Sequence, residues 1–282
     1  MTEQLASRAM IAYLSCSQWS ARKLDRSATA EVTANHAAAS DAGRFNKQTI
    51  PKEALYPIQK VVSAARNYFT ANTLPWSDNG DRALSSLHYF KVMEQLRLYR
   101  VEFEDAVHEF CTNYDQHRER ARLRLNSLFD VNDYPVVSEV ARKFSFVFGV
   151  MPLPTASDFR VTMADDEVDE VRQEIQAQLD VRANTMMADV WGQLKSHMAH
   201  LKERLDNGGR QHDSTLTNIT DLLERLPGFN ITNDVGLEAM RVEIKNSLQG
   251  LTMKDIRDDD QLRSATADKT ADILKQMAGL MG

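Results

Sequence analysis

The sequence has little cysteine and lacks the long apolar runs that would point to a membrane or a secreted protein. Its two cysteines, Cys16 and Cys111, lie far apart without metal-like spacing, so we expect two idle thiols. No run of about 18 apolar residues is present, and residues 1–7 lack the basic then apolar order of a secretory signal. These absences predict a protein of the cytoplasm in which it is made.

Glycine-rich loops that bind phosphate groups are also missing. The chain has 11 glycines, and none of the patterns G-x-G-x-x-G, G-x-x-x-x-G-K-[ST] or G-x-S-x-G occurs. The first two patterns hold nucleotide phosphates and the third presents a catalytic serine. We therefore expect no ATP hydrolysis, no cofactor and no enzymatic activity, although the members of a catalytic triad need not be neighbours in sequence.

Positive charge is not in excess either. The net charge of −6 argues against a protein whose whole surface attracts nucleic acid, and only a local basic patch remains compatible with it. The chain has 282 residues, of which 43% are hydrophobic, so it is long enough and apolar enough to bury a true core.

What is present is mainly the pattern of α-helix. Apolar residues recur every three or four positions from Leu84 to Tyr114, in a stretch without glycine or proline, which predicts a helix over about 81–128. A second apolar face runs from Val168 to Leu205, after acidic residues that suit a helix start. Two long helices with a compact insertion between them predict an antiparallel, coiled-coil-like hairpin.

The insertion has the pattern of β-structure. Phenylalanines alternate from Phe144 to Phe148, and Phe159 begins a second alternating run after a turn at 152–157, which predicts a β-hairpin over 143–163. A lone hairpin is marginally stable in water, so its apolar face needs a cover. Residues 9–15 could supply a third strand, or another protein chain could cover it. The interaction-surface candidates are Phe144, Phe146, Phe148 and Phe159.

The predicted fold class is therefore mainly α, with a long helical hairpin, a small antiparallel β-sheet at its end and additional short helices. The expected segments are 1–75, with a strand at 9–15 and helices over about 17–38 and 51–71; 76–209, the hairpin with its β insertion; and 210–282, short helices.

Two basic features are candidates for binding nucleic acid. Trp19 stands near Arg22 and Lys23, and an aromatic side chain flanked by cations can stack a base while the charges follow the phosphates. A buried tryptophan beside a solvated basic face is the alternative. The second feature is two rows of arginines at i and i+4, which could clamp phosphates or neutralise the acidic start of the returning helix. These rows are Arg118 with Arg122 and Arg120 with Arg124.

A metal site has weaker support. His197 and His200 lie three residues apart on one predicted helix face, where both imidazoles could reach one ion. Structural zinc usually takes four such ligands, so the pattern favours a solvated helix face and we expect no metal.

Three stretches carry a resemblance to a known family. These are "SQWSARKLD" near the start, "LPWSDNGDRAL" over 74–84 and "KFSFVFGVMPLPTASDFRV" over 143–161. In order and spacing they resemble a family of uncharacterised proteins, encoded by tailed bacteriophages and prophages, over roughly residues 14–248. The resemblance implies a viral origin and a neighbouring ring-forming ATPase of the MoxR type, and it supplies no catalytic residues.

These observations favour a non-enzymatic, homo-oligomeric interaction protein that docks on a phage or host protein machine, with a MoxR-type ATPase as one candidate partner. The alternative is an accessory factor that binds single-stranded nucleic acid in phage replication or transcription. An enzyme with an unrecognised site is the third hypothesis.

Overall fold

The computed structural model describes residues 2–77, 79–154, 165–207 and 214–281. The chain forms two compact units, and each unit combines segments that are distant in sequence. Unit 1 comprises 1–13, 72–90 and 150–282, and unit 2 comprises 14–71 and 91–149. The units are therefore interleaved rather than consecutive, because the strands β1 and β6 and the helix α4 each continue from one unit into the other.

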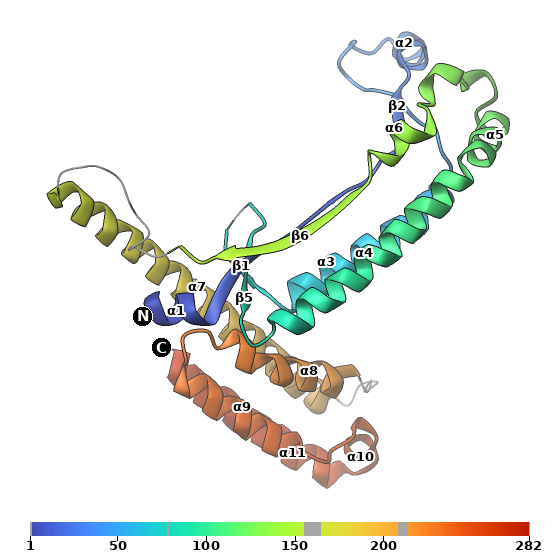
Figure 1. Cartoon of the computed structure of the whole chain (residues 1–282). Coiled ribbons are helices and arrows are strands. Elements are labelled where there is room, and N and C mark those ends of the chain that lie inside the picture. The colour runs from blue at the N-terminus through green and yellow to red at the C-terminus, as the bar shows by residue number, and fades with distance from the viewer. Residues whose placement is uncertain (1, 78, 155–164, 208–213, 282) are drawn as a thin grey trace. The chain divides into compact units, whose positions relative to one another are not determined.

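Unit 1 is mainly helical (Figure 1). Its elements are α1 (Thr2–Arg8), the first part of β1 (Ala9–Ser17), β4 (Leu74–Pro75), β5 (Arg82–Ser85), the end of β6 (Ser145–Pro152), α7 (Asp165–Asn207), α8 (Ser214–Phe229), α9 (Val235–Leu248), α10 (Met253–Asp258) and α11 (Asp260–Met281). The apolar face predicted between Val168 and Leu205 is buried at six of its positions. These are Leu179, Met186, Val190, Leu194, Leu201 and Leu205. α7 packs along α11 and α8, and α9 in turn packs on α8 and α11.

The sheet has the strand order β4-β5-β1-β6. β1 and β5 are antiparallel, with Ala9 opposite Ser85 and Ala12 opposite Arg82, and β4 pairs antiparallel with β5. The third strand predicted at residues 9–15 is thus present as β1, next to β6. The second strand of the predicted β-hairpin, with Phe159, lies outside the described residues.

Unit 2 contains most of the remaining elements. They are β2 (Arg22–Leu24), α2 (Arg26–Asn35), β3 (Asn46–Gln48), α3 (Lys52–Ala71), α4 (Tyr89–Thr112) from Lys91 onward, α5 (Tyr114–Leu125), the 3₁₀ turns at Asn126–Leu128 and Val131–Asp133, α6 (Val137–Ala141) and most of β6. Its core is rich in aromatic rings: Phe103 of α4 lies 5.5 Å from Phe146 of β6, and Phe110 lies 5.7 Å from Phe144, measured between centroids. The predicted fold class, mainly α with a small antiparallel sheet, is confirmed.

The long helix predicted over 81–128 differs from the structure at its start and in its middle. Residues Arg82–Ser85 form β5, because pairing with β1 satisfies their backbone groups, and the helix begins only at Tyr89. Asn113 then separates α4 from α5. The two long helices of the predicted hairpin fall in different compact units, because α4 from Lys91 onward belongs to unit 2 and α7 belongs to unit 1. An apolar stripe indicates that a face is buried but does not indicate which element covers it.

The helix predicted over 17–38 is likewise shorter than expected. β1 continues to Ser17, β2 follows at Arg22–Leu24, and the helix begins at Arg26 after the capping residue Asp25. The helix predicted over 51–71 is confirmed as α3, which accommodates Pro57 near its start. In the described ranges, none of the helices combines the length and the apolar character needed to cross a lipid bilayer.

Candidate functional site

A surface hollow in unit 1 runs along the outer side of α9. It has a volume of about 990 Å³, and its lining comes from α9, the end of α8, the loop before α9, Arg8, Leu87 and Lys269 of α11. Three of its apolar side chains are well exposed: Val235 at 78%, Leu87 at 67% and Val242 at 42%. We call this hollow, with Leu87, Val235 and Val242 at its surface, the α9 groove.

The apolar stripe of the groove follows from the helical period of α9. Val235, Ala239 and Val242 lie at i, i+4 and i+7 and all line the groove, so they form one ridge along the helix. Leu237, Met240 and Ile244 lie on the opposite side and are buried in the core of unit 1. α9 therefore has a second apolar face that no described element of unit 1 buries.

Asp234 fixes the start of α9. Its Oδ1 accepts a hydrogen bond from the backbone N–H of Leu237 at 3.1 Å, which is the capping contact, and its Oδ2 accepts one from the indole N–H of Trp191 at 2.9 Å. Asn230 holds the same residue from the other side, because its amide donates to the Asp234 carbonyl at 2.8 Å and accepts from the Asp234 N–H at 2.6 Å. The groove therefore starts from a rigid corner.

The end of α8 closes this corner. Gly228 lies against the imidazole ring of His88, at a place where a Cβ atom would overlap that ring. The ring of His88 in turn meets Phe229 edge-on, with 6.2 Å between centroids. This close approach brings the loop that carries Leu87 against the α8–α9 corner.

Some of the charged side chains along the groove already make hydrogen bonds or ion pairs, and others do not. Glu238 accepts two hydrogen bonds from the guanidinium of Arg241, at 2.8 and 2.6 Å, and this contact lowers the pKa of Glu238 and raises that of Arg241. Both carboxylate oxygens of Asp234 are also bonded, and Glu243 accepts from Gln276 at 3.2 Å. The side chains of Arg8 and Lys269, in contrast, make no hydrogen bond or ion pair within the described ranges.

In unit 2 the structure brings the two predicted basic features together at Gln48. Arg22 of β2 donates to the side-chain oxygen of Gln48 at 3.4 Å, and Arg124 of α5 donates to the backbone carbonyl of the same residue at 2.8 Å. The other arginines lie along exposed or half-exposed positions of α5. Arg118 pairs with Asp115, Arg122 pairs with Glu119, and Arg120 is exposed.

Trp19 belongs mainly to the aromatic core of unit 2. Its ring lies 6.4 Å from that of Phe110 and 6.3 Å from that of Tyr114, between centroids, and the side chain is half-buried. These two ring contacts engage Trp19 in the packing of the core. The structure therefore supports the alternative in which Trp19 is a packing residue. The β2–β3 ribbon (22–24 and 46–48) lies next to it in sequence and exposes Arg22 and Lys23.

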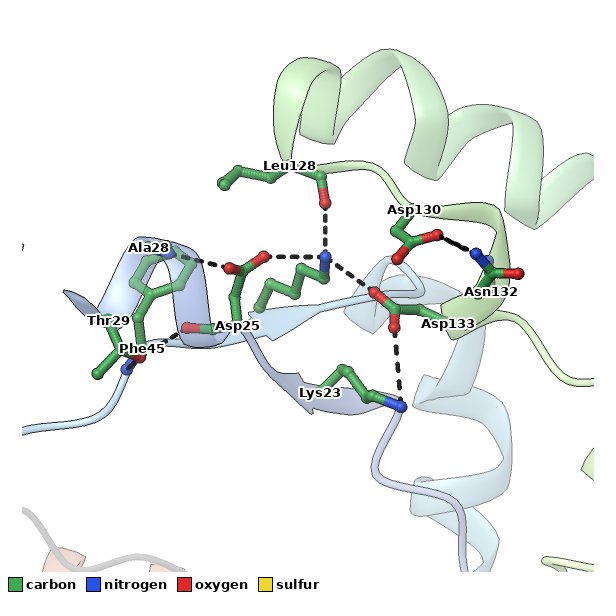
Figure 2. A network of polar contacts seen from close by, with 10 residues as sticks. Lys23, Asp25, Ala28, Thr29, Phe45, Leu128, Asp130, Asn132 and Asp133 are labelled. Atoms are coloured by element: carbon green, nitrogen blue, oxygen red, sulfur yellow. Dashed lines mark hydrogen bonds and ion pairs between the residues drawn. The ribbon is translucent and has the colours of Figure 1, made fainter. Parts of the chain in front are cut away.

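Asp25, Leu128 and Asp133 converge in the polar network beside this ribbon (Figure 2), and all three bind one buried lysine. The ammonium of Lys47 on β3 lies 3.0 Å from Asp25, 2.8 Å from Asp133 and 2.7 Å from the carbonyl oxygen of Leu128, and its side chain is only 6% exposed. Burial alone would lower the pKa of Lys47, but the bonds to Asp133 and Asp25 outweigh it and raise this pKa. Lys23 adds a longer contact of 3.7 Å to Asp133.

Three of the four predicted surface phenylalanines are described, and none of these three is exposed. Phe144 and Phe146 are buried in the aromatic core of unit 2, and Phe148 is half-buried beneath the guanidinium of Arg100, at 5.5 Å from the ring centroid. As surface candidates these residues are replaced by the exposed side chains of the α9 groove. Sequence inspection missed the groove because the apolar ridge of α9 looks the same whether it is covered or open.

The predicted weak metal ligands do not gather a site. Burial, followed by the nearby charges of Arg225 and His200, lowers the pKa of His197, and His200 is exposed. Over the described residues, no group of three or more His, Cys, Asp or Glu side chains is placed to hold an ion. Burial also raises the pKa of the half-buried thiols of Cys16 and Cys111, which favours the thiol over the thiolate form.

Comparison with known proteins adds no relative to this description. No family model matches the chain, and neither a curated protein nor a solved structure shows significant similarity to it. The resemblance to bacteriophage proteins stays a prediction from the sequence.

Proposed function

We propose that this chain is a non-enzymatic interaction protein, encoded by a bacteriophage, that docks on a protein machine of the phage or its host in the host cytoplasm. The observation that carries the proposal is the α9 groove, where Leu87, Val235 and Val242 expose apolar surface beside charged side chains. Exposed apolar patches rimmed by polar residues are typical of protein interaction sites. A MoxR-type ATPase is the partner that the sequence resemblance favours, and a homo-oligomer is the expected state of the chain.

Affinity purification of the tagged full chain from infected cells tests this proposal. Val235→Asp combined with Val242→Asp should reduce the captured partner at least tenfold, because each carboxylate would have to be buried in an apolar contact. The control is Val181→Asp, which places one such carboxylate on an exposed position of α7 outside the groove and should leave capture unchanged. Equal capture by all three proteins would contradict docking through the groove.

A second candidate function rests on the contacts of Gln48. They bring Arg22 of β2 and Arg124 of α5 to the same residue of unit 2, with Lys23 exposed next to Arg22, which supports a small phosphate-binding surface. The chain would then be an accessory factor that binds single-stranded nucleic acid.

A fluorescence titration with a labelled single-stranded oligonucleotide at 50 and 200 mM salt tests this second candidate. Binding that involves these phosphate contacts should weaken about tenfold or more at the higher salt, and Arg22→Ala with Lys23→Ala should remove most of it. Lys60→Ala, which changes an exposed lysine of α3, serves as the control. No binding at the lower salt would exclude this function.

A further inference from the structure

The α9 groove has the geometry of a surface that receives a helix. Its ridge of Val235, Ala239 and Val242 repeats at i, i+4 and i+7, and ridges of this period pack into the grooves of another helix. Leu87 supplies an apolar wall beside the ridge, since it lines the same hollow. An amphipathic helix laid along α9 would therefore meet apolar side chains over about two turns.

Arg8 and Lys269, whose side chains make no hydrogen bond or ion pair to any residue that the structure describes, lie toward opposite ends of this ridge. The carbonyl of Arg8 accepts hydrogen bonds from the backbone and the hydroxyl of Ser86, which places Arg8 beside Leu87 and the α8–α9 corner, where α9 begins. α11 runs antiparallel to α9, because Gly236 lies against Leu280 and Glu243 accepts from Gln276. Lys269, further back along α11, accordingly lies toward the Ser247 end of the groove.

Arg8 and Lys269 carry N–H donors, so a molecule bound in the groove needs acceptor groups for them. The carboxylates in the groove do not bind them: Asp234 bonds to Trp191 and caps α9, Glu238 bonds to Arg241, and Glu243 bonds to Gln276. From Val235 to Ser247 the axis of α9 rises about 18 Å, which is the span of about 12 residues in a partner helix. Carboxylates spaced by that distance would complete both ends.

We propose that the α9 groove binds an amphipathic helix of a partner protein that carries acidic residues at both ends of its apolar stripe, so that Arg8 and Lys269 each receive a carboxylate. This inference rests on the proposed docking function and specifies the chemistry of the partner. The apolar stripe supplies the affinity, and the two terminal ion pairs set the direction of preference between acidic and basic helices.

Two synthetic helical peptides test the inference in a fluorescence anisotropy titration with the full chain. Both carry leucines at i, i+4 and i+7; one has glutamates about 11 residues apart, which is about three turns, at the ends of that face, and the other has lysines there. The glutamate peptide should bind at least tenfold more tightly. Arg8→Glu combined with Lys269→Glu should reverse the preference, and Val235→Asp with Val242→Asp should abolish the binding of both.

The results distinguish a wrong partner chemistry from a wrong docking function. Equal affinity for the two peptides, no binding of either, or no reversal in the double charge variant overturns the inference. If the groove variants nevertheless lose partner capture from infected cells, the docking function stands and only the proposed chemistry of the partner is wrong. Circular dichroism and thermal melting of every variant should match those of the original chain, which separates lost binding from lost fold.

Discussion

Replacing Lys47 with methionine is expected to destabilise the β2–β3 ribbon and the turn around Asp133 by about 3 kcal/mol. Methionine keeps the length of the side chain but leaves the buried carboxylate of Asp133 and the carbonyl of Leu128 without the ammonium that now contacts both. Removing one partner from a buried ionic contact is costly because the other partner stays desolvated. Hydrogen exchange measured by mass spectrometry over 22–48 and 126–134 should show protection reduced by about 100-fold.

Lys60→Met is the matched control, because Lys60 is an exposed residue of α3 and its loss should change stability by less than about 0.5 kcal/mol. The effect at Lys47 should also depend on pH. Backbone bonding from Ala28, and then bonding from Lys47, lowers the pKa of Asp25 in the folded state. The stabilisation tied to that carboxylate is therefore present above its unfolded value of about 3.9 and is lost as the pH falls through the lower folded value. Unchanged exchange in Lys47→Met at neutral pH would contradict a structural role for this contact.

The elements with long, regular apolar faces were the predictable part of this fold. α7 covers the apolar periodicity from Val168 to Leu205, and α3 covers the helix predicted over 51–71. Helical period and caps are local signals, so they survive without knowledge of the tertiary structure. β1 was predictable for a similar reason, because a short apolar run over 9–15 suits a strand.

The parts that failed depend on contacts between distant residues. Arg82–Ser85 read as the beginning of a helix, yet pairing with Ala9–Ala12 makes them a strand, since strand formation depends strongly on the neighbouring chain. The partner of α7 could not be predicted either: its stripe is compatible with any apolar helix, and α8 and α11 cover it. The basic candidates show the same limit, because Arg22 and Arg124 are distant in sequence and both contact Gln48 only in the folded chain.

The α9 groove shows the same limit for a functional site. Val235 and Val242 have the spacing of core residues, and only the structure shows that they are exposed while Leu237 and Ile244 form the buried face. Lys47 is the opposite case: a lysine between polar residues suggests a solvated position, but three oxygen acceptors from separate segments enclose it. Burial is a property of the assembled unit, so neither position was open to sequence inspection.

Gly228→Ala is expected to destabilise the α8–α9 corner by about 2 kcal/mol, although alanine is ordinarily the better helix residue. The added methyl group would occupy the space of the His88 imidazole, so either the ring or the end of α8 has to move. His88 also packs edge-on against Phe229, which limits how far the ring can retreat. Thermal unfolding of the full chain, with hydrogen exchange over 214–248 as the local readout, measures the effect.

A double-mutant cycle with His88→Ala separates this overlap from any other effect of the substitution. The His88→Ala background lacks the ring. In it, Gly228→Ala should stabilise the protein by about 0.5 kcal/mol, because alanine lowers the backbone entropy of the unfolded chain. A sign reversal of this kind requires that the glycine is present to admit the ring rather than to provide backbone freedom. If Gly228→Ala were equally destabilising in both backgrounds, close packing on His88 would not explain the glycine, and the corner that carries Leu87 into the α9 groove would need another origin.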